Sequence, residues 1–365
     1  MMRLKPQQTF PMAALIQRRR TFFLWLAGLS AAVLISIVLA VCYGTVRIPP
    51  EEALRILLYK ILQADISEVA GQVSRAHMDI IWEIRFPRVL MAVTAGAGLA
   101  MCGTVMQAAV QNPLADPYIL GISAGASLGA TFAVLIGAGG IFAGLGTAFW
   151  AFCGALGACL LVMALSGIGG QMSTVKMILA GTIANALFSA FTNFIIYTAG
   201  NAEGIRSVAF WTMGSLAAAK WSNLLLPALG VILCGSLFLC QSRILNTLLL
   251  GEEAAITLGV NLPRVRRNYM LATALITGLI VSACGVIGFV GLIIPHIVRG
   301  LVGTDHRRLL PFTILAGALF VTWADVLTRI ILESGELPIG IITALLGAPV
   351  FMYILFKNTL GFSSK

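Results

Sequence analysis

The sequence predicts an all-α, polytopic membrane protein with about ten transmembrane helices. Hydrophobic residues make up 59% of the 365 residues and charged residues only 10%, whereas about a quarter of the residues in soluble domains are charged. Apolar runs of about twenty residues, long enough to cross a bilayer as helices, recur along the chain. Basic residues gather beside these runs, so the net charge of +10 indicates membrane orientation and not a nucleic-acid-binding face.

The first apolar run covers residues 21–43 and follows a basic tail, residues 1–20. A helix of this length extends about 34 Å, which is enough to span a bilayer. The tail contains Arg18, Arg19 and Arg20 directly before the run. Because basic residues stay on the cytoplasmic side, we predict a cytoplasmic N-terminus.

Residues 44–84 form the longest polar stretch, which this orientation places outside the cytoplasm. Pro50, Glu51 and Glu52 indicate a helix start, with proline and acids in the first turn. Apolar residues then follow at helical spacing, predicting an amphipathic helix on the outer surface. They are Leu54, Leu57, Leu58, Ile61 and Leu62.

A polar break at residues 111–117 separates the second and third predicted spans. Its Pro113 and Pro117 prevent one continuous helix. Gly121, Gly125 and Gly129 follow at the GxxxG spacing that lets membrane helices pack closely. Residues 200–220 form an outer connection, and the C-terminus is predicted to be cytoplasmic. The spans after the first cover residues 86–110, 118–136, 141–165, 174–199, 221–241, 268–290, 292–302, 309–332 and 339–356.

The second polar stretch, residues 242–267, lies on the cytoplasmic side in this topology. Breaks at Gly251, Gly259 and Pro263 predict two short helices, neither long enough to cross the membrane. The chain therefore divides into a tail at 1–20, one transmembrane domain at 21–356 that includes 44–84 and 242–267, and a cytoplasmic tail at 357–365.

Weak similarity between two parts of the sequence favours an inverted repeat, as many transporters have. The alternative is chance identity in helices rich in glycine and alanine. An offset of 182 residues aligns Arg85, Gly96, Cys102 and Gly103 with Arg267, Gly278, Cys284 and Gly285.

Several long motifs resemble one known family. They read RFPR at 85–88, GAGLAMCGTVMQ at 96–107, QNPLADPYILGISAGASLGA at 111–130, GFVGLIIPHIVRGLVGTDHRRLLP at 288–311 and ELPIGIITALLGAP at 336–349. These runs are similar to the signatures of FecCD/BtuC-type permeases, the ATP-binding-cassette importers of iron-siderophores, haem and cobalamin in bacteria. The resemblance implies a transport subunit in the bacterial inner membrane and not an enzyme.

The source of energy must be external. The chain has no G-x-x-x-x-G-K-[ST] loop for ATP, so the resemblance implies two ATPase subunits that hold ATP and magnesium, while this chain binds no cofactor. The alternative is a secondary transporter driven by an ion gradient. That reading needs ionisable residues within the membrane, and the candidates are few; Asp325 and Arg329 lie four residues apart and are predicted to pair.

The resemblance implies that the second polar stretch couples to the ATPase. A solvated amphipathic helix is the alternative. The predicted coupling residues are Leu250, Gly251, Glu252, Glu253, Ala254, Leu258 and Gly259.

At the outer rim, the family resemblance assigns Arg85, Arg88 and Arg329 to docking of an extracytoplasmic substrate-binding protein. Arginine suits carboxylate partners, although interfacial anchoring by long side chains would also explain these positions. The resemblance further assigns a cytoplasmic gate, with helix capping by the polar pair as the alternative. The gate residues are Asn112, Leu114, Thr174 and Val175.

No arrangement of His, Cys and acids has metal-ligand or catalytic spacing in the sequence, so we expect no metal bound by this chain. The seven cysteines fall in apolar runs and are interpreted as packing residues. The implied assembly contains a second permease copy or a paralogue. Ferric siderophore is the first expected substrate, because it is the broadest substrate group that the resemblance implies. Haem and cobalamin stay open, because the resemblance implies that selectivity resides largely in the binding protein.

Overall fold

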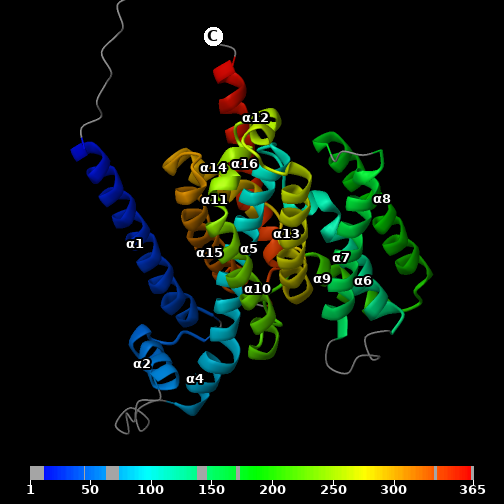
Figure 1. Ribbon diagram of the computed structural model, residues 1–365. Coiled ribbons are helices and arrows are strands. Elements are labelled where there is room, and N and C mark those ends of the chain that lie inside the picture. The colour runs from blue at the N-terminus through cyan, green and yellow to red at the C-terminus, as the bar shows by residue number, and fades with distance from the viewer. Residues whose placement is uncertain are drawn as a thin grey trace, which may run out of the picture.

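The computed structural model describes residues 12–44, 46–62, 74–137, 146–169, 173–332 and 335–362. Every regular element within these ranges is a helix (Figure 1). Seven of the helices are long and apolar enough to cross a membrane, and three further apolar helices are shorter. Backbone groups in lipid need internal hydrogen bonds, which helices supply. The all-α membrane fold is confirmed, and the count of about ten segments stays a prediction.

The centre of the protein is α5 (Phe86–Val110), nearly all of whose residues are buried. It is surrounded by α10 (Trp221–Cys240), α13 (Leu262–Cys284), α14 (Val290–Val302) and α15 (His306–Ile330). Small residues allow this burial. A Cβ at Gly96 would overlap the carbonyl of Gly317 on α15, and one at Gly103 would overlap the carbonyl of Gly291 on α14.

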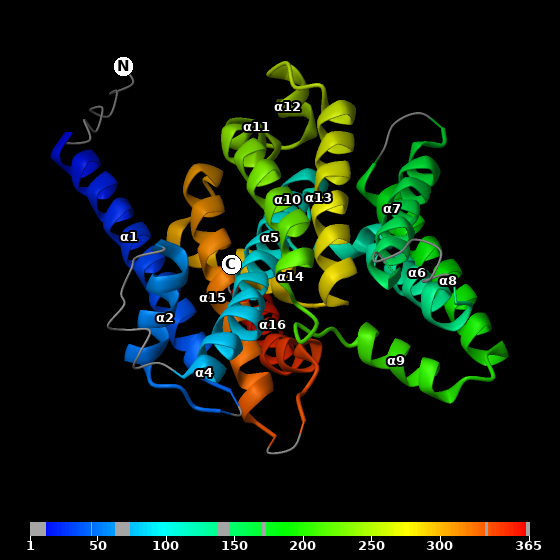
Figure 2. The same cartoon turned by 90° about the horizontal axis from the view of Figure 1, so that it is seen from below.

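A second group of helices lies beside this centre: α6 (Ile122–Leu135), α7 (Gly146–Gly167) and α8 (Thr174–Thr198) (Figures 1 and 2). The short helix α9 (Ala202–Thr212) leads back toward α10. A Cβ at Gly125 would overlap the carbonyl of Gly154, and one at Gly129 would overlap that of Trp150. The close packing predicted from the GxxxG spacing is therefore confirmed between α6 and α7.

Two opposite ends of the bundle carry the elements between the spans (Figure 1). At one end lie α2 (Pro50–Leu62), α4 (Arg75–Asp79) and the π-helical turn η1 (Ile80–Arg85). At the other lie α11 (Ser242–Leu248) and α12 (Glu252–Thr257), with the start of α1 (Met12–Cys42) and the last turns of α16 (Ile339–Phe362). This separation agrees with the predicted outer and cytoplasmic regions.

Several helices extend beyond their predicted bounds. Helix α1 begins at Met12 and α16 continues to Phe362, so helix replaces parts of both predicted tails. Helix α13 begins at Leu262 and takes the last residues of the stretch predicted as 242–267. The reason is that Asn261 caps it by accepting a hydrogen bond from the Arg264 amide (3.2 Å), and proline is tolerated in a first turn.

The order of helix lengths repeats. Helices α5 to α8 have 25, 14, 22 and 25 residues, and α13 to α16 have 23, 13, 25 and 24. Both short helices follow a residue of positive φ, Gly121 at 73° and Phe289 at 69°. The predicted offset of 182 residues does not align these two groups of helices. It pairs Gly103, which lies inside α5, with Gly285, which ends α13.

Candidate functional site

The first candidate surface is α12, which projects at the end of the bundle predicted to be cytoplasmic (Figure 1). Its acids Glu252 and Glu253 are exposed, as are the apolar Leu250 and Leu258 that flank it. Ala255 faces the other way and is buried in the core. An exposed patch of leucines and acids on a short anchored helix is a surface suited to protein docking.

Glycines set both ends of α12. Gly251 has φ of 102° and Gly259 has φ of 83°, a region that L side chains rarely adopt. The breaks predicted at these two positions are confirmed. Ala254, between them, is half-buried, so the predicted coupling residues lie together on one small helix and its two flanking turns.

The predicted gate residues lie where α5 ends and α8 begins. The Thr174 hydroxyl, at the start of α8, donates to the carbonyl of Val110, the last residue of α5 (2.9 Å). Two residues further along, Asn112 accepts a hydrogen bond from the Leu114 amide (2.9 Å). Leu114 and Val175 are both exposed. Gating itself stays a prediction, but the structure brings both pairs together.

Capping by the side chains of Thr174 and Asn112 is wrong. Ser173 is the cap of α8, because its hydroxyl accepts from the Lys176 amide (3.3 Å). Gln111 ends α5 in the left-handed conformation, with φ of 54°. The Thr174 hydroxyl instead donates to the Val110 carbonyl and so links the start of α8 to the end of α5.

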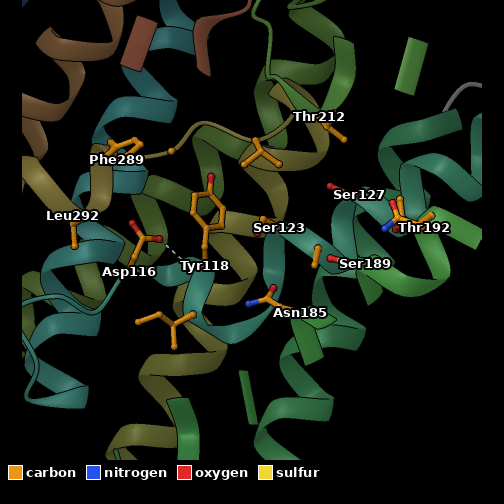
Figure 3. Close-up of a pocket in the computed structure, with 15 residues that line it drawn as sticks. Asp116, Tyr118, Ser123, Ser127, Asn185, Ser189, Thr192, Thr212, Phe289 and Leu292 are labelled. Atoms are coloured by element: carbon orange, nitrogen blue, oxygen red, sulfur yellow. Dashed lines mark hydrogen bonds between the residues drawn. The ribbon is translucent and has the colours of Figure 1, made fainter. Parts of the chain in front are cut away.

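A cavity of about 740 Å³ lies between α6, α8 and the segment that leads into α14 (Figure 3). Most of its polar groups are hydroxyls and amides, which can bond a ligand without holding it tightly. Among the described residues no cluster of three or more His, Cys, Asp and Glu could hold a metal ion. The polar lining residues are Asp116, Tyr118, Ser123, Ser127, Asn185, Ser189, Thr192, Asn193 and Thr212.

Asp116 is the acid of this cavity. Its carboxylate caps the short helix η2 (Pro117–Leu120) by accepting from the Tyr118 amide (2.8 Å). Burial raises the pKa of the Asp116 carboxyl to about 6, and the hydrogen bond from Tyr118 opposes that rise. The Tyr118 hydroxyl donates to the Ile287 carbonyl (3.0 Å), which ties η2 to the segment before α14.

The sequence prediction missed this cavity, although one signal was present. Ser123 and Ser127 lie four residues apart in an apolar helix, as do Asn185 and Ser189. Polar residues at that spacing share one helix face, and a polar face within an apolar helix indicates a protein interior or a water-filled path.

The three arginines predicted to dock a binding protein are buried and have internal partners. Arg85 donates to the carbonyls of Val41 (2.9 Å) and Cys42 (3.1 Å). These carbonyls end α1 and have no intrahelical partner. Arg85 therefore caps α1 from η1, which explains why its side chain points inward and not toward an outer rim.

Arg88 and Arg329 share one carboxylate. Asp325 on α15 lies 2.9 Å from Arg88 Nε and 3.1 Å from Arg329 Nη2, so the predicted pairing of Asp325 with Arg329 is confirmed. Arg88 also binds Glu336 (2.8 Å), and Arg329 donates to the Tyr43 carbonyl (2.8 Å). Docking of a binding protein through these arginines stays a prediction. It now requires the arginines to give up their internal partners and to contact the binding protein instead.

An α-helical bundle with a polar cavity, an exposed short helix at one end and a hydrogen bond between the ends of two spanning helices is consistent with the architecture of a membrane permease. The chain belongs to the FecCD transport family, whose model matches residues 32–357. It is the permease subunit of an ATP-binding-cassette importer of the FecCD/BtuC type, a multi-pass membrane protein that acts as a transport component.

Its relatives include an uncharacterised ABC transporter permease, YvrB of Bacillus subtilis, which is 38% identical over 90% of this chain and 92% of the relative. The vitamin B12 import permease BtuC of Klebsiella pneumoniae is 38% identical over 94% of this chain and 96% of the relative. A solved structure described as an inward-facing, metal-chelate type ABC transporter matches with a TM-score of 0.78 and 33% identity, covering 91% of this chain and 98% of that one.

Proposed function

We propose that this permease imports a bulky metal chelate, which crosses the membrane through the cavity lined by Asp116, α6 and α8. The cavity of about 740 Å³ carries this proposal. Its hydroxyl and amide lining offers many weak contacts, and a path needs binding that is weak enough to release its ligand. Family membership supports ATP on a partner as the energy source over the ion-gradient alternative.

A corrinoid and a ferric siderophore are the two substrates to compare. The sequence alone favoured a siderophore. The vitamin B12 permeases among the relatives support a corrinoid instead, because their similarity covers almost the whole chain. Haem is a third candidate substrate, and the uptake experiment described below includes it. All three are bulky chelates that could move along a path lined by uncharged polar groups.

The partners follow from the two ends and one side of the bundle. Two ATPase subunits would dock on α12, and a substrate-binding protein would dock at the end that carries α2 and η1. The side of α8 supports a second permease copy or a paralogue, because a row of large apolar residues is exposed there at four-residue spacing. This row contains Leu179, Ile183, Leu187 and Phe191.

The proposed cycle has three steps. A loaded binding protein delivers the chelate to the outer end. ATP binding and hydrolysis on the partner subunits move α12. That movement separates the contact between Thr174 and Val110, and the chelate leaves the cavity toward the cytoplasm.

The test is uptake of labelled cobalamin, ferric siderophore and haem by bacterial cells that lack the gene, with and without its restoration. Uptake of one chelate that returns only with the intact gene, and only when cells hold ATP, is the expected result. Uptake that persists after ATP depletion but is abolished by collapse of the proton gradient would overturn the ATP-driven mechanism. If no chelate depends on the gene, the substrate class is wrong.

A further inference from the structure

Arg266 is an arginine in the predicted cytoplasmic cluster that does not reach solvent. It lies in the second turn of α13 and is 2% exposed, whereas Arg264 and Arg267 beside it are exposed. An arginine that only orients the chain in the membrane would remain in water. Burial of a charge costs several kcal/mol unless it has partners, so the contacts of Arg266 need a reason.

The guanidinium joins two elements that are separate in the sequence. Its Nη2 lies 2.6 Å from Oε1 of Glu252 on α12, and its Nε donates to the carbonyl of Ala109 in the last turn of α5 (2.9 Å). Arginine can hold both at once because its donors form a rigid fork. Lysine, with a single ammonium, would not match this geometry.

Ala109, Val110 and Gln111 form what we call the 109–111 junction. The carbonyls of Gln107 and Ala108 accept the amides of Asn112 and Gln111, which leaves the next two carbonyls of the helix end for other donors. The first accepts from Arg266. The second, of Val110, accepts from the Thr174 hydroxyl of α8 (2.9 Å).

The third residue of the 109–111 junction binds the coupling region directly. The side-chain amide of Gln111 donates to the carbonyl of Leu248 at the end of α11 (2.7 Å). Gln111 adopts a left-handed conformation there, with φ of 54°. Three consecutive residues at the end of α5 therefore contact α13, α8 and α11, so a displacement of α12 reaches the gate helix through one helix end.

We propose that Arg266 is the positioning residue that transmits movement of α12 to the gate, through Glu252 on one side and the 109–111 junction on the other. This inference rests on the proposed docking of the ATPase at α12. Glu252 is well placed to receive the signal, because its side chain is 46% exposed while its carboxylate holds a buried partner. If this ion pair separated, the buried guanidinium of Arg266 would lose its carboxylate partner. A concerted shift of α5 and α12 is therefore favoured over movement of α12 alone.

A second connection offers a rival route. On α11, Asn246 donates to Asp305 (2.7 Å) and accepts from the His306 amide (2.8 Å), which ties the coupling region to the start of α15. This connection does not reach the 109–111 junction. If it carried the signal, loss of the Asn246 side chain would uncouple the transporter and loss of the Arg266 contacts would not.

The experiment uses the complete complex of permease, ATPase and binding protein in proteoliposomes, and measures substrate moved per ATP hydrolysed. The variants are Arg266→Lys, which keeps the charge, and Glu252→Gln, which removes the charge of a half-exposed side chain but keeps its shape and one hydrogen-bond acceptor for Arg266. We expect both to keep ATPase binding, to lower this ratio at least about fivefold and to lose stimulation of hydrolysis by the loaded binding protein. Arg264→Lys, at an exposed arginine of the same helix, is the matched control and keeps the wild-type ratio.

A wild-type ratio in Glu252→Gln would overturn the proposal, whether or not Arg266→Lys folds. Uncoupling by Asn246→Ala together with a normal ratio in both test variants would overturn it in favour of the α15 route. Failure of the proposed function has a different signature, because the ATPase would then not co-purify with the wild-type permease. Loss of ATPase binding in Glu252→Gln alone would assign that residue to docking and would also overturn the transmission role.

Discussion

Arg88 and Asp325 form an ion pair inside the protein, 2.9 Å between Nε and Oδ1, although 237 residues separate them in the sequence. The same carboxylate holds Arg329 at 3.1 Å. Asp325 is 1% exposed, so one buried acid joins α5 to α15 and balances two arginines. Both buried arginines therefore lose a charged partner if this carboxylate is removed.

Replacement of Asp325 by asparagine should destabilise the permease strongly. Removal of one partner of a buried ion pair costs about 3 to 5 kcal/mol, because the remaining charge stays buried without compensation. Thermal unfolding in detergent measures the effect. The matched control is Glu336→Gln, since that side chain is 40% exposed and contacts only one of the two arginines. Equal unfolding temperatures for both variants would contradict the shared-carboxylate interpretation.

Gly96→Ala should destabilise the packing of α5 on α15. The added methyl group would overlap the Gly317 carbonyl, and overpacking of a tight interface costs about 1 to 3 kcal/mol or more. Gly157→Ala is the control, because a Cβ at this position of α7 meets nothing within 4 Å and alanine favours helix over glycine. The unfolding temperature should fall for the first variant and stay level or rise for the second. The reverse order would show that this close approach is not required.

A change of Glu252 and Glu253 together to lysine should abolish uptake and leave membrane insertion intact. Both side chains are exposed on α12, and Glu252 also pairs with the buried Arg266, so charge reversal alters the docking surface and this ion pair but not the apolar spans that insert in the membrane. Co-purification of the ATPase, measured beside uptake, should fall to background. Glu203→Lys on α9 is an exposed acid away from α12 and should change neither. Normal uptake by the double variant would contradict coupling through α12.

Docking at the outer end predicts that Arg329→Ala lowers the affinity for the binding protein. Because Arg329 also donates to the Tyr43 carbonyl and pairs with Asp325, the unfolding temperature should fall as well. Arg47→Ala removes an exposed arginine of the same outer region and should not alter stability. Affinity measured by light scattering or fluorescence that stays at the wild-type value in Arg329→Ala would assign the arginine to structure alone.

The gate prediction concerns the contact between Thr174 and Val110. Thr174→Val keeps the shape of the side chain and removes its hydrogen bond, so the start of α8 should be held less firmly at the end of α5. We expect a several-fold rise in ATP-independent leak of the transported chelate from proteoliposomes. Thr174→Ser restores the hydroxyl and should restore the seal. A leak equal in all three proteins would show that this contact does not gate the path.

Much of the secondary structure was predictable from local pattern. The predicted span 86–110 agrees with α5, and the start of α8 at Thr174 agrees with the structure. Apolar runs of membrane length must form helices because lipid offers the backbone no hydrogen bonds. The breaks at Gly251 and Gly259 were also identifiable, since glycine readily adopts a backbone conformation that other residues avoid.

The burial of particular charges was not predictable in the same way. Arg264, Arg266 and Arg267 look alike as members of one basic cluster, yet only Arg266 is buried. Its spacing from Leu262 and Tyr269, which are also buried, places it on the inner face of α13. That spacing was the signal in the sequence that Arg266 is buried. The spacing does not indicate that Ala109 is the partner of Arg266.

The sequence by itself determined that this chain is a helical membrane permease and where its main spans and breaks lie, because hydrophobic length and turn residues act locally. Only the tertiary structure decided that Arg85, Arg88 and Arg329 point inward, that Asp325 serves two arginines, and that Arg266 connects α12 to the end of α5. Most of these contacts join residues distant along the chain. They arise when helices pack closely enough that each buried charge must find a partner on a neighbouring helix or bear the cost of desolvation.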